Sequence, residues 1–284
     1  MWQVGGRSVR GASHAQRGLP NQDALRCHQP TNPDGCAVVA IADGHGHARY
    51  FRSHNGAKLA VKTAVTLLTS FAAEQQGMTL STTKRLAAER LPRQLVRVWR
   101  DQVADHLARH PFREDEWQTV DARGGPGARQ RIEADPQVAY GATVIAVLIG
   151  PEYLLCLQLG DGDILTVDDD GAVTRPPLPN DPRLMANQTT SLCMAEAWAD
   201  VRLHFQSLAD RPPRLLLLST DGYANSFADE AGFLAVGGDL LASIAAQGID
   251  GVQRRLGGWL THTSQAGSGD DITLGLAYRT TDVA

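Results

Sequence analysis

The stretch GCAVVAIADGHGH, Gly35–His47, is the best starting point for predicting the fold. Its first part is a short, continuous apolar run rich in alanine and β-branched residues, which predicts a buried strand over Gly35–Asp43. Asp43 ends that strand, and a loop punctuated by glycine follows it. A buried strand holds the side chain at its end rigidly, while the loop beyond admits water and substrate. Asp43 is therefore a candidate functional residue.

Two more aspartates occupy comparable positions. Asp221 ends the apolar run RLLLLSTD, and Asp270 precedes DITLGLAY. Carboxylates crowded into one place repel one another unless a hard cation neutralises them. Three such positions predict a site for Mg²⁺ or Mn²⁺ with oxygen ligands. For any one of these residues, the alternative is an ordinary turn or helix-cap aspartate.

The short segments around these acids form an ordered set. They are SHAQRGLPNQD (13–23), DGHGH (43–47), LGDGD (159–163), STDGY (219–223) and SGDDIT (268–273). Together they resemble the type 2C, metal-dependent serine/threonine protein phosphatases, the PPM family. The resemblance runs from Ser13 to Tyr278 in the family's order, and it is closest to the bacterial branch with a Gly-x-Pro-x-Gln-Asp segment.

The resemblance implies an α+β fold, a four-layer α-β-β-α sandwich in which two central antiparallel sheets are flanked by helix pairs. The apolar patterns agree with it. We expect strands over 23–28, 35–43, 141–150, 153–159, 163–167, 201–205, 214–220 and 272–278, and a hairpin turn at 168–171. We expect helices over 57–71, 83–109, 239–247 and 250–264, with Pro92 as an alternative start of the second helix.

The proposed metal acids run from Asp23 to Asp270 and must converge in space. We therefore predict one domain over residues 1–284, with variable surface excursions near 111–138 and 176–200. Loops on a rigid scaffold often carry specificity, so these excursions are candidates for substrate selection.

The resemblance also implies a metal centre for two manganese or magnesium ions, with a third ion in bacterial members. Asp43 matches the acid that bridges two ions, and Asp161 the acid that holds the third with Asp221. The full set of metal residues that it implies is Asp43, Gly44, Asp221, Asp270, Asp23 and Asp161. His45 matches the family's general acid. Asp271 stands where the family usually has asparagine.

The family clamps the phosphate with an arginine, whose planar fork suits phosphate oxygens. Arg17 matches this arginine and is therefore a candidate catalytic and substrate-binding residue. It lies one residue further from Asp23 than the family's usual spacing. His14 is an alternative substrate contact. Gln22 replaces a glutamate ligand of eukaryotic members. For both Arg17 and His14, the other interpretation is a solvated N-terminal loop.

The function implied is hydrolysis of phosphoserine and phosphothreonine by a water or hydroxide that bridges the two ions. The partners implied are phosphorylated proteins and a Ser/Thr kinase or its targets. One alternative is a regulatory or binding module that keeps the fold but has lost turnover, because Arg17 is displaced and the glutamate is missing. The other is a hydrolase for a different phosphoester, such as a nucleotide.

The composition restricts the partners further. The 284 residues carry 27 basic and 31 acidic side chains, and the net charge of -4 argues against nucleic-acid or membrane binding. The N-terminal residues lack the apolar stretch of a signal peptide, and the longest apolar run, Ala142–Ile149, is shorter than the roughly 20 residues of a membrane span. We expect a cytoplasmic monomer with buried thiols at Cys27, Cys36, Cys156 and Cys193.

Overall fold

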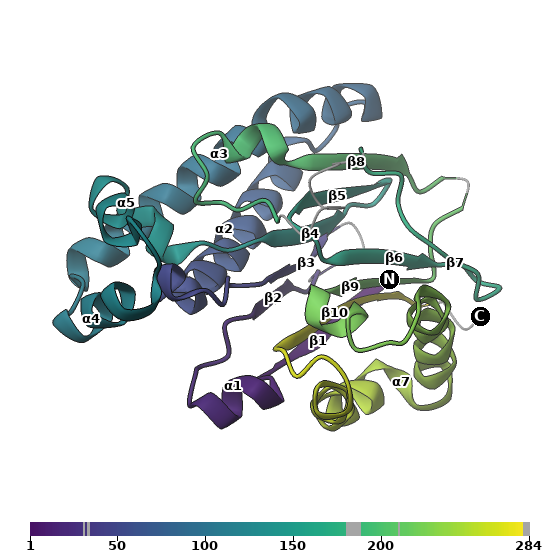
Figure 1. Cartoon of the computed structure of the whole chain (residues 1–284). Coiled ribbons are helices and arrows are strands. Elements are labelled where there is room, and N and C mark those ends of the chain that lie inside the picture. The colour runs from purple at the N-terminus through teal and green to yellow at the C-terminus, as the bar shows by residue number, and fades with distance from the viewer. Residues whose placement is uncertain (31, 33–34, 180–188, 210, 281–284) are drawn as a thin grey trace.

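The computed structural model describes residues 1–30, 32, 35–179, 189–209 and 211–280, and in these residues two five-stranded antiparallel sheets pack face to face (Figure 1). Sheet A has the order β1 (Trp2–Val9), β10 (Ile272–Arg279), β9 (Leu215–Ser219), β6 (Asp163–Val167) and β7 (Val173–Thr174). Sheet B has the order β2 (Ala24–His28), β3 (Ala37–Ala42), β4 (Val144–Ile149), β5 (Tyr153–Leu159) and β8 (Arg202–Ser207).

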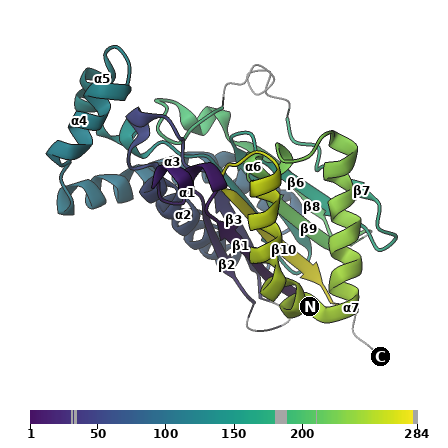
Figure 2. The same cartoon turned by 60° about the horizontal axis from the view of Figure 1, so that its bottom comes forward.

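Long helices cover the outer face of each sheet. Helices α2 (Ser53–Glu74) and α3 (Leu80–Arg109) lie over sheet B, and α7 (Glu230–Ala266) lies over sheet A (Figures 1 and 2). Gly248 breaks α7 into two helical segments, since its φ of 72° lies in the left-handed region. These layers confirm the predicted α-β-β-α sandwich.

Shorter helices occupy the connections. They are α1 (Ala12–Arg17), η1 (Ala48–Tyr50), α4 (Glu114–Arg123), α5 (Ala128–Ala134), η2 (Pro136–Tyr140), η4 (Ala197–Asp200) and α6 (Asp221–Ala224). Three of them, α4, α5 and η2, lie in or next to the excursion 111–138, which therefore has regular structure. Of the second excursion, 176–200, residues 180–188 lie outside the described residues.

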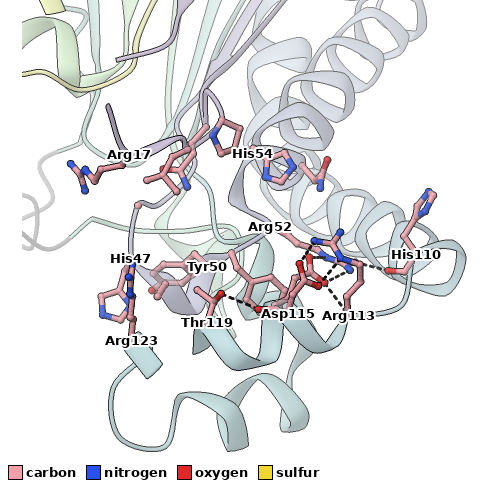
Figure 3. A pocket seen from close by; sticks show the side chains of 18 of the residues that line it. Arg17, His47, Tyr50, Arg52, His54, His110, Arg113, Asp115, Thr119 and Arg123 are labelled. Atoms are coloured by element: carbon pink, nitrogen blue, oxygen red, sulfur yellow. Dashed lines mark hydrogen bonds and ion pairs between the residues drawn. The ribbon is translucent and has the colours of Figure 1, made fainter. Parts of the chain in front are cut away.

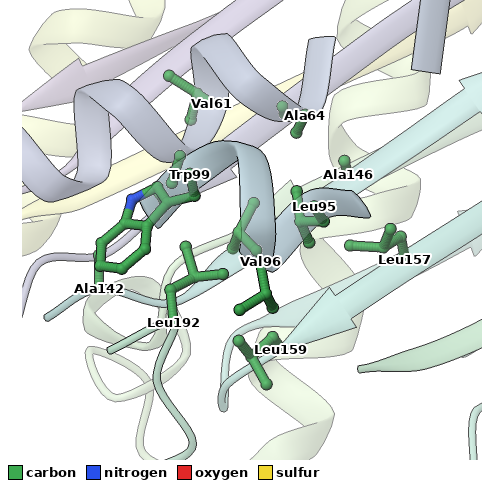
Figure 4. Close-up of a cluster of buried hydrophobic side chains, with 14 of the residues drawn as sticks. Val61, Ala64, Leu95, Val96, Trp99, Ala142, Ala146, Leu157, Leu159 and Leu192 are labelled. Carbon is green, nitrogen blue, oxygen red and sulfur yellow. The ribbon is translucent and has the colours of Figure 1, made fainter. Parts of the chain in front are cut away.

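Apolar side chains fill three layers between these elements. The layer between sheet B and its helices is centred on Trp99, which is fully buried and whose indole N–H donates to the Gly56 carbonyl at 3.0 Å (Figure 4). A second layer, which includes Ile41 and Leu216, lies between the sheets, and a third lies between sheet A and α7. Every residue of β3 and β4 is buried, which explains why both strands are continuously apolar in sequence.

Two features at the start of the chain and in α3 differ from expectation. Residues Trp2–Val9 form β1, which pairs with β10 along its whole length and which the sequence pattern did not predict. Pro92 lies inside α3, which begins twelve residues earlier, so the alternative start at Pro92 is wrong. Leu91, Pro92 and Leu95 are all buried, and the burial of this stretch of α3 offsets the hydrogen bond that proline removes.

Other expectations have mixed outcomes. The four cysteines are free thiols, but only Cys156 and Cys193 are buried, while Cys27 and Cys36 are half-buried. The hairpin turn is confirmed, since Asp168 Oδ1 accepts hydrogen bonds from the backbone N–H groups of Asp170 and Ala172. The extent of the domain, residues 1–284, stays a prediction.

Helix α7 is, among the described residues, the one helix long and apolar enough to cross a membrane by length and composition. Length and composition are weak grounds, because core helices of soluble proteins pass the same test. Gly248 interrupts the helix, and Phe233, Ile244 and Val252 pack against sheet A. The apolar residues on this face of α7 thus contribute to the core of the fold.

Candidate active site

The loop after β3 is held in place by the segment that leads into β4. The Asp43 N–H donates to Thr143 Oγ1 at 3.0 Å, and the Thr143 N–H donates to the Asp43 carbonyl at 2.8 Å. One step further, the His45 N–H donates to the Gly141 carbonyl at 3.2 Å. Because β3 and β4 are hydrogen-bonded neighbours, these contacts fix Asp43 at the end of sheet B.

Gly44 is required at its position by close backbone approach. A Cβ atom there would lie 2.7 Å from the Gln22 carbonyl oxygen and 2.8 Å from the Ser53 carbonyl oxygen. Neither backbone atom can move aside cheaply. The Asp-Gly step therefore lets the β3 loop, the entry to β2 and the start of α2 meet beside Asp43.

Asp221 and Asp270 come from the ends of two neighbouring strands of sheet A. Asp221 begins α6 directly after β9, and Asp270 lies two residues before β10, which pairs with β9. A Cβ atom on Gly222 would lie 2.2 Å from the Asp271 carbonyl oxygen. The second Asp-Gly step thus also brings two acidic segments together.

These segments surround a cavity of about 590 Å³, which we call the carboxylate cavity. Both sheets contribute to it, at the end of the sandwich where β3 and β9 terminate. Seven of the residues singled out from the sequence line it, namely His14, Asp43, Gly44, His45, Asp161, Asp221 and Asp270.

Asp23 lies behind the cavity wall and is only 5% exposed. Thr220 Oγ1 donates to Asp23 Oδ2 at 2.8 Å, which places Asp23 beside the residue that precedes Asp221. Burial raises the pKa of Asp23 to about 8, against the lowering effect of the Thr220 hydrogen bond.

Two acids of the cavity, Asp43 and Asp221, also hold their protons more tightly than an ordinary aspartate does. Burial, and then the charges of Asp23 and Asp221, raise the pKa of Asp43 well above its ordinary value. Burial and the charge of Asp161 raise the pKa of Asp221 to about 6. Carboxyl groups that disfavour one another's charge in this way form a suitable donor set for a hard divalent cation. The residues present therefore fit magnesium or manganese.

Asp271, in contrast, is engaged in hydrogen bonds with other parts of the protein and is not assigned to the metal site. It is 3% exposed, and its two oxygens accept hydrogen bonds from the Gly11 N–H and the Gln22 N–H, each at 2.6 Å. Its Oδ2 also lies 2.8 Å from His14 Nδ1, and His14 Nε2 lies 3.7 Å from Asp270 Oδ1. Ligand atoms of His14, Asp270 and Asp271 lie within 4.8 Å of one another, close enough for a metal. Since both Asp271 oxygens are already engaged, we assign Asp271 to holding His14 and the N-terminal segment.

The structure places Arg17 outside the carboxylate cavity. It is exposed at the end of α1, its Nε donates to the Ser13 carbonyl at 3.2 Å, and its side chain lines a neighbouring cavity. Arg49, which sequence reasoning missed, does line the carboxylate cavity. Its guanidinium lies 4.6 Å from the centre of the Tyr50 ring, and its buried Nε has no hydrogen-bond partner among the described residues. Its place shortly after DGHGH was the signal available in the sequence.

His45 is uncharged in this setting. Burial, followed by the charge of Arg49, lowers its pKa to about 4. Its ring lies 4.8 Å from the ring of Tyr50, centre to centre. At neutral pH His45 can therefore donate or accept a hydrogen bond, but it carries no extra proton to give.

The fold is shared with bacterial serine/threonine phosphatases. The S. agalactiae enzyme aligns over 99% of this chain and 100% of its own, with 18% identity and a TM-score of 0.60. The catalytic domain of PstP, described as a complex with two manganese ions, aligns over 98% and 97%, with 16% identity and a TM-score of 0.56. Stp1 from Staphylococcus aureus aligns over 99% and 96%, with 14% identity and a TM-score of 0.53.

At these identities the structural likeness concerns the fold. Among curated proteins, no sequence matches the chain significantly. The profile of the protein phosphatase 2C family matches residues 10–261, which is most of the chain. The chain therefore belongs to the protein phosphatase 2C family.

Proposed function

We propose that this protein is a metal-dependent phosphatase that hydrolyses phosphoserine and phosphothreonine in other proteins. The observation that carries the proposal is the convergence of Asp43, Asp161, Asp221 and Asp270 on one cavity, with Asp23 directly behind it. Membership of the protein phosphatase 2C family supports it. The free thiols suit a reducing compartment, so the proposed location is the cytoplasm. The proposed partners are phosphorylated proteins and the kinases that produce them.

Asp43, Asp221 and Asp270 would hold manganese or magnesium in this proposal, with Asp161 completing a further site and Asp23 supporting Asp43 from behind. The two manganese ions described for PstP support this choice of metal. When bound, divalent ions activate water for attack and offset the charge of a phosphate group.

Arg49 is the residue we assign to the substrate phosphate. Its guanidinium is pre-positioned on Tyr50, its Nε is unpartnered, and it lines the same cavity as the acids. An arginine fork can donate two parallel hydrogen bonds to phosphate oxygens. A phosphate between Arg49 and the acids would be fixed for in-line attack.

His45 is the residue we assign to the leaving oxygen. With a pKa of about 4 it is neutral at pH 7, so its contribution is an N–H hydrogen bond to the departing serine or threonine oxygen. Such a bond stabilises charge that develops on the leaving group.

The proposal is tested by phosphate release from a phosphothreonine peptide with manganese present. We expect turnover by the wild type and a loss of about 100-fold or more in Asp43→Asn, because a central ligand charge is removed. Folding of the variant is checked by circular dichroism. Equal inactivity of both proteins would refute the proposal, and faster turnover of nucleotides than of phosphopeptides would favour a different phosphoesterase.

A further inference from the structure

Figure 3 shows the residues that line a second cavity of about 970 Å³, which we call the side cavity. The two cavities share Gln22, Gly46, His47 and Tyr50 as lining residues. One wall of the side cavity is helix α4, from the excursion 111–138. A chain that enters the carboxylate cavity can therefore continue into the side cavity.

The side cavity is positively charged although the whole protein has a net charge of -4. Among the described residues, four arginines and two acids line it. Both acids are already neutralised: Glu116 pairs with Arg52 at 2.7 Å, and Asp115 pairs with Arg113 at 2.9 Å. In the part of the chain that the structure describes, the charges of the two other arginines have no counter-ion.

Those two arginines are Arg17 and Arg123, and neither forms an ion pair within the described part of the chain. Arg17 ends α1 and Arg123 ends α4, and in the view of Figure 3 both lie toward the left of the cavity, Arg17 above and Arg123 below. Both side chains are exposed, so their guanidinium groups are free to reach a ligand. Planar guanidinium forks recognise carboxylates and phosphates.

A further polar group lies at the junction of the two cavities. Gln22 is 8% exposed, and its Nε2 donates to Ser53 Oγ at 2.9 Å. Its Oε1 is buried and has no hydrogen-bond partner among the described residues. This oxygen lies near Gly46, a residue of both cavities, where it can accept an N–H from a bound peptide.

From this arrangement we propose that the side cavity binds an acidic segment next to the phosphorylated residue of a protein substrate. The proposal rests on the proposed phosphatase function and names its substrate class: phosphopeptides whose neighbouring residues are aspartate, glutamate or a second phosphorylated residue. Arg17 and Arg123 supply the charge that selects this segment, and α4 supplies the wall.

Three phosphothreonine peptides that differ only in their flanking residues, glutamate, alanine or lysine, test the preference. We expect kcat/KM to be about fivefold higher for the glutamate than for the alanine peptide, and lowest for the lysine peptide. The preference should shrink in high salt, because exposed charges are screened. Equal kcat/KM values for all three peptides would overturn the proposal.

Charge reversal of Arg123 is the sharper test. Arg123→Glu should lower kcat/KM for the glutamate peptide and raise it for the lysine peptide, while turnover of the small substrate p-nitrophenyl phosphate stays unchanged. Arg97→Glu, at an exposed position of α3 outside both cavities, is the matched control and should leave the preference as it is. An unchanged preference in Arg123→Glu would contradict the proposal.

A binding measurement separates this proposal from the phosphatase function. Fluorescence anisotropy with the same peptides in unphosphorylated, labelled form reports the side cavity whether or not the protein has turnover. Tighter binding of the glutamate peptide, weakened in Arg123→Glu, supports the side-cavity proposal even if hydrolysis fails. Hydrolysis without any charge preference in either assay supports the phosphatase function and overturns the side-cavity proposal.

Discussion

Asp270 and Asp271 are adjacent in sequence but differ in role because their oxygens contact different groups. Asp270 is exposed to the carboxylate cavity, whereas Asp271 is buried under hydrogen bonds from Gly11, Gln22 and His14. His14 lies between the two carboxylates and so ties the orientation of Asp270 to the buried network.

We predict that Asp271→Asn destabilises the protein by about 1–3 kcal/mol, since one of its oxygens becomes a donor that faces a backbone N–H. Urea unfolding of the metal-free variant measures this. Asn225→Ala, which removes an exposed hydrogen bond to Asp221, is the comparison and should have a smaller effect on stability. A variant as stable as the wild type would contradict the role given to Asp271.

His45 leads to a prediction about the pH dependence of activity. The pKa of about 4 means that His45 is deprotonated throughout pH 5–8, so its titration causes no fall in kcat over that range. A His45→Asn variant should lose about tenfold in kcat, the worth of one hydrogen bond to the leaving oxygen. The check is kcat against pH for both proteins. A fall in wild-type kcat between pH 5 and 7 that vanishes in the variant would show instead that His45 acts as a charged acid.

At the scale of single residues, the sequence was enough to identify the acids of the site, but it was less informative about the arginine assigned to the phosphate. Asp43, Asp161, Asp221 and Asp270 could be placed because strand ends and Asp-Gly steps mark them. The sequence pointed to Arg17 and missed Arg49, because the direction of each side chain depends on the short helices α1 and η1.

A buried arginine, Arg52, ties helix α4 to the rest of the fold. Arg52, at the start of α2, donates to both oxygens of Glu116 at 2.8 and 2.7 Å, and also to the carbonyl of Pro111 and the hydroxyl of Tyr140. Its guanidinium lies 4.7 Å from the centre of the Phe112 ring. The wall of the side cavity is thus held in place by α2 and η2.

We predict that Arg52→Lys destabilises the protein by about 3 kcal/mol, because lysine cannot satisfy this planar set of acceptors and leaves a buried carboxylate poorly paired. Hydrogen exchange should show lost protection within residues 111–138. Asp115→Asn breaks only the exposed pair with Arg113 and serves as the control, with no measurable change expected. Equal stability of both variants would contradict the role of Arg52 in holding α4 in place.

The same ion pair predicts sensitivity to acid. Burial would raise the pKa of Glu116, but the hydrogen bonds from Arg52 outweigh it and hold the pKa below its ordinary value. A lowered folded-state pKa means that this stability is present above the unfolded-state pKa and is lost as the pH falls through the folded-state value. Stability measured between pH 7 and pH 3 should therefore fall less steeply in Glu116→Gln than in the wild type. Parallel pH profiles would contradict this.

At the scale of elements, strong apolar periodicity was enough to predict the central strands and the long helices. It did not reveal β1, whose segment WQVGGRSV contains two glycines and polar residues and which forms an edge strand through its pairing with β10. Nor did it reveal α4 and α5, because their helical form depends on contacts such as the Arg52–Glu116 pair.

The packing of the two sheets brings acids that are distant in sequence to the same end of the sandwich. Asp43 closes a strand of sheet B, while Asp221 and Asp270 belong to sheet A, so neither sheet alone contains the candidate site. The order of the motifs predicted that these acids meet. Their burial and mutual electrostatic effects follow only from the packing of the sheets.

This crowding predicts how the stability of the metal-free protein changes with pH. In the unfolded chain an aspartate loses its proton near pH 4, but folded Asp23 keeps it until about pH 8. The folded state therefore binds more protons between these values, and stability falls as the pH rises from 4 to 8. Thermal unfolding at pH 5 and pH 8 with a chelator should show the higher Tm at pH 5. Manganese should raise Tm most at pH 8. If the Tm of the metal-free protein does not change with pH, this would contradict the burial of these acids.

Calorimetric titration of the metal-free protein with manganese at pH 7 shows whether these carboxyl groups form a divalent-cation site. We expect saturable binding by the wild type and strongly weakened binding by Asp43→Asn, in a variant that remains folded. Absence of binding by the wild type, or equal binding by both proteins, would contradict the proposed site.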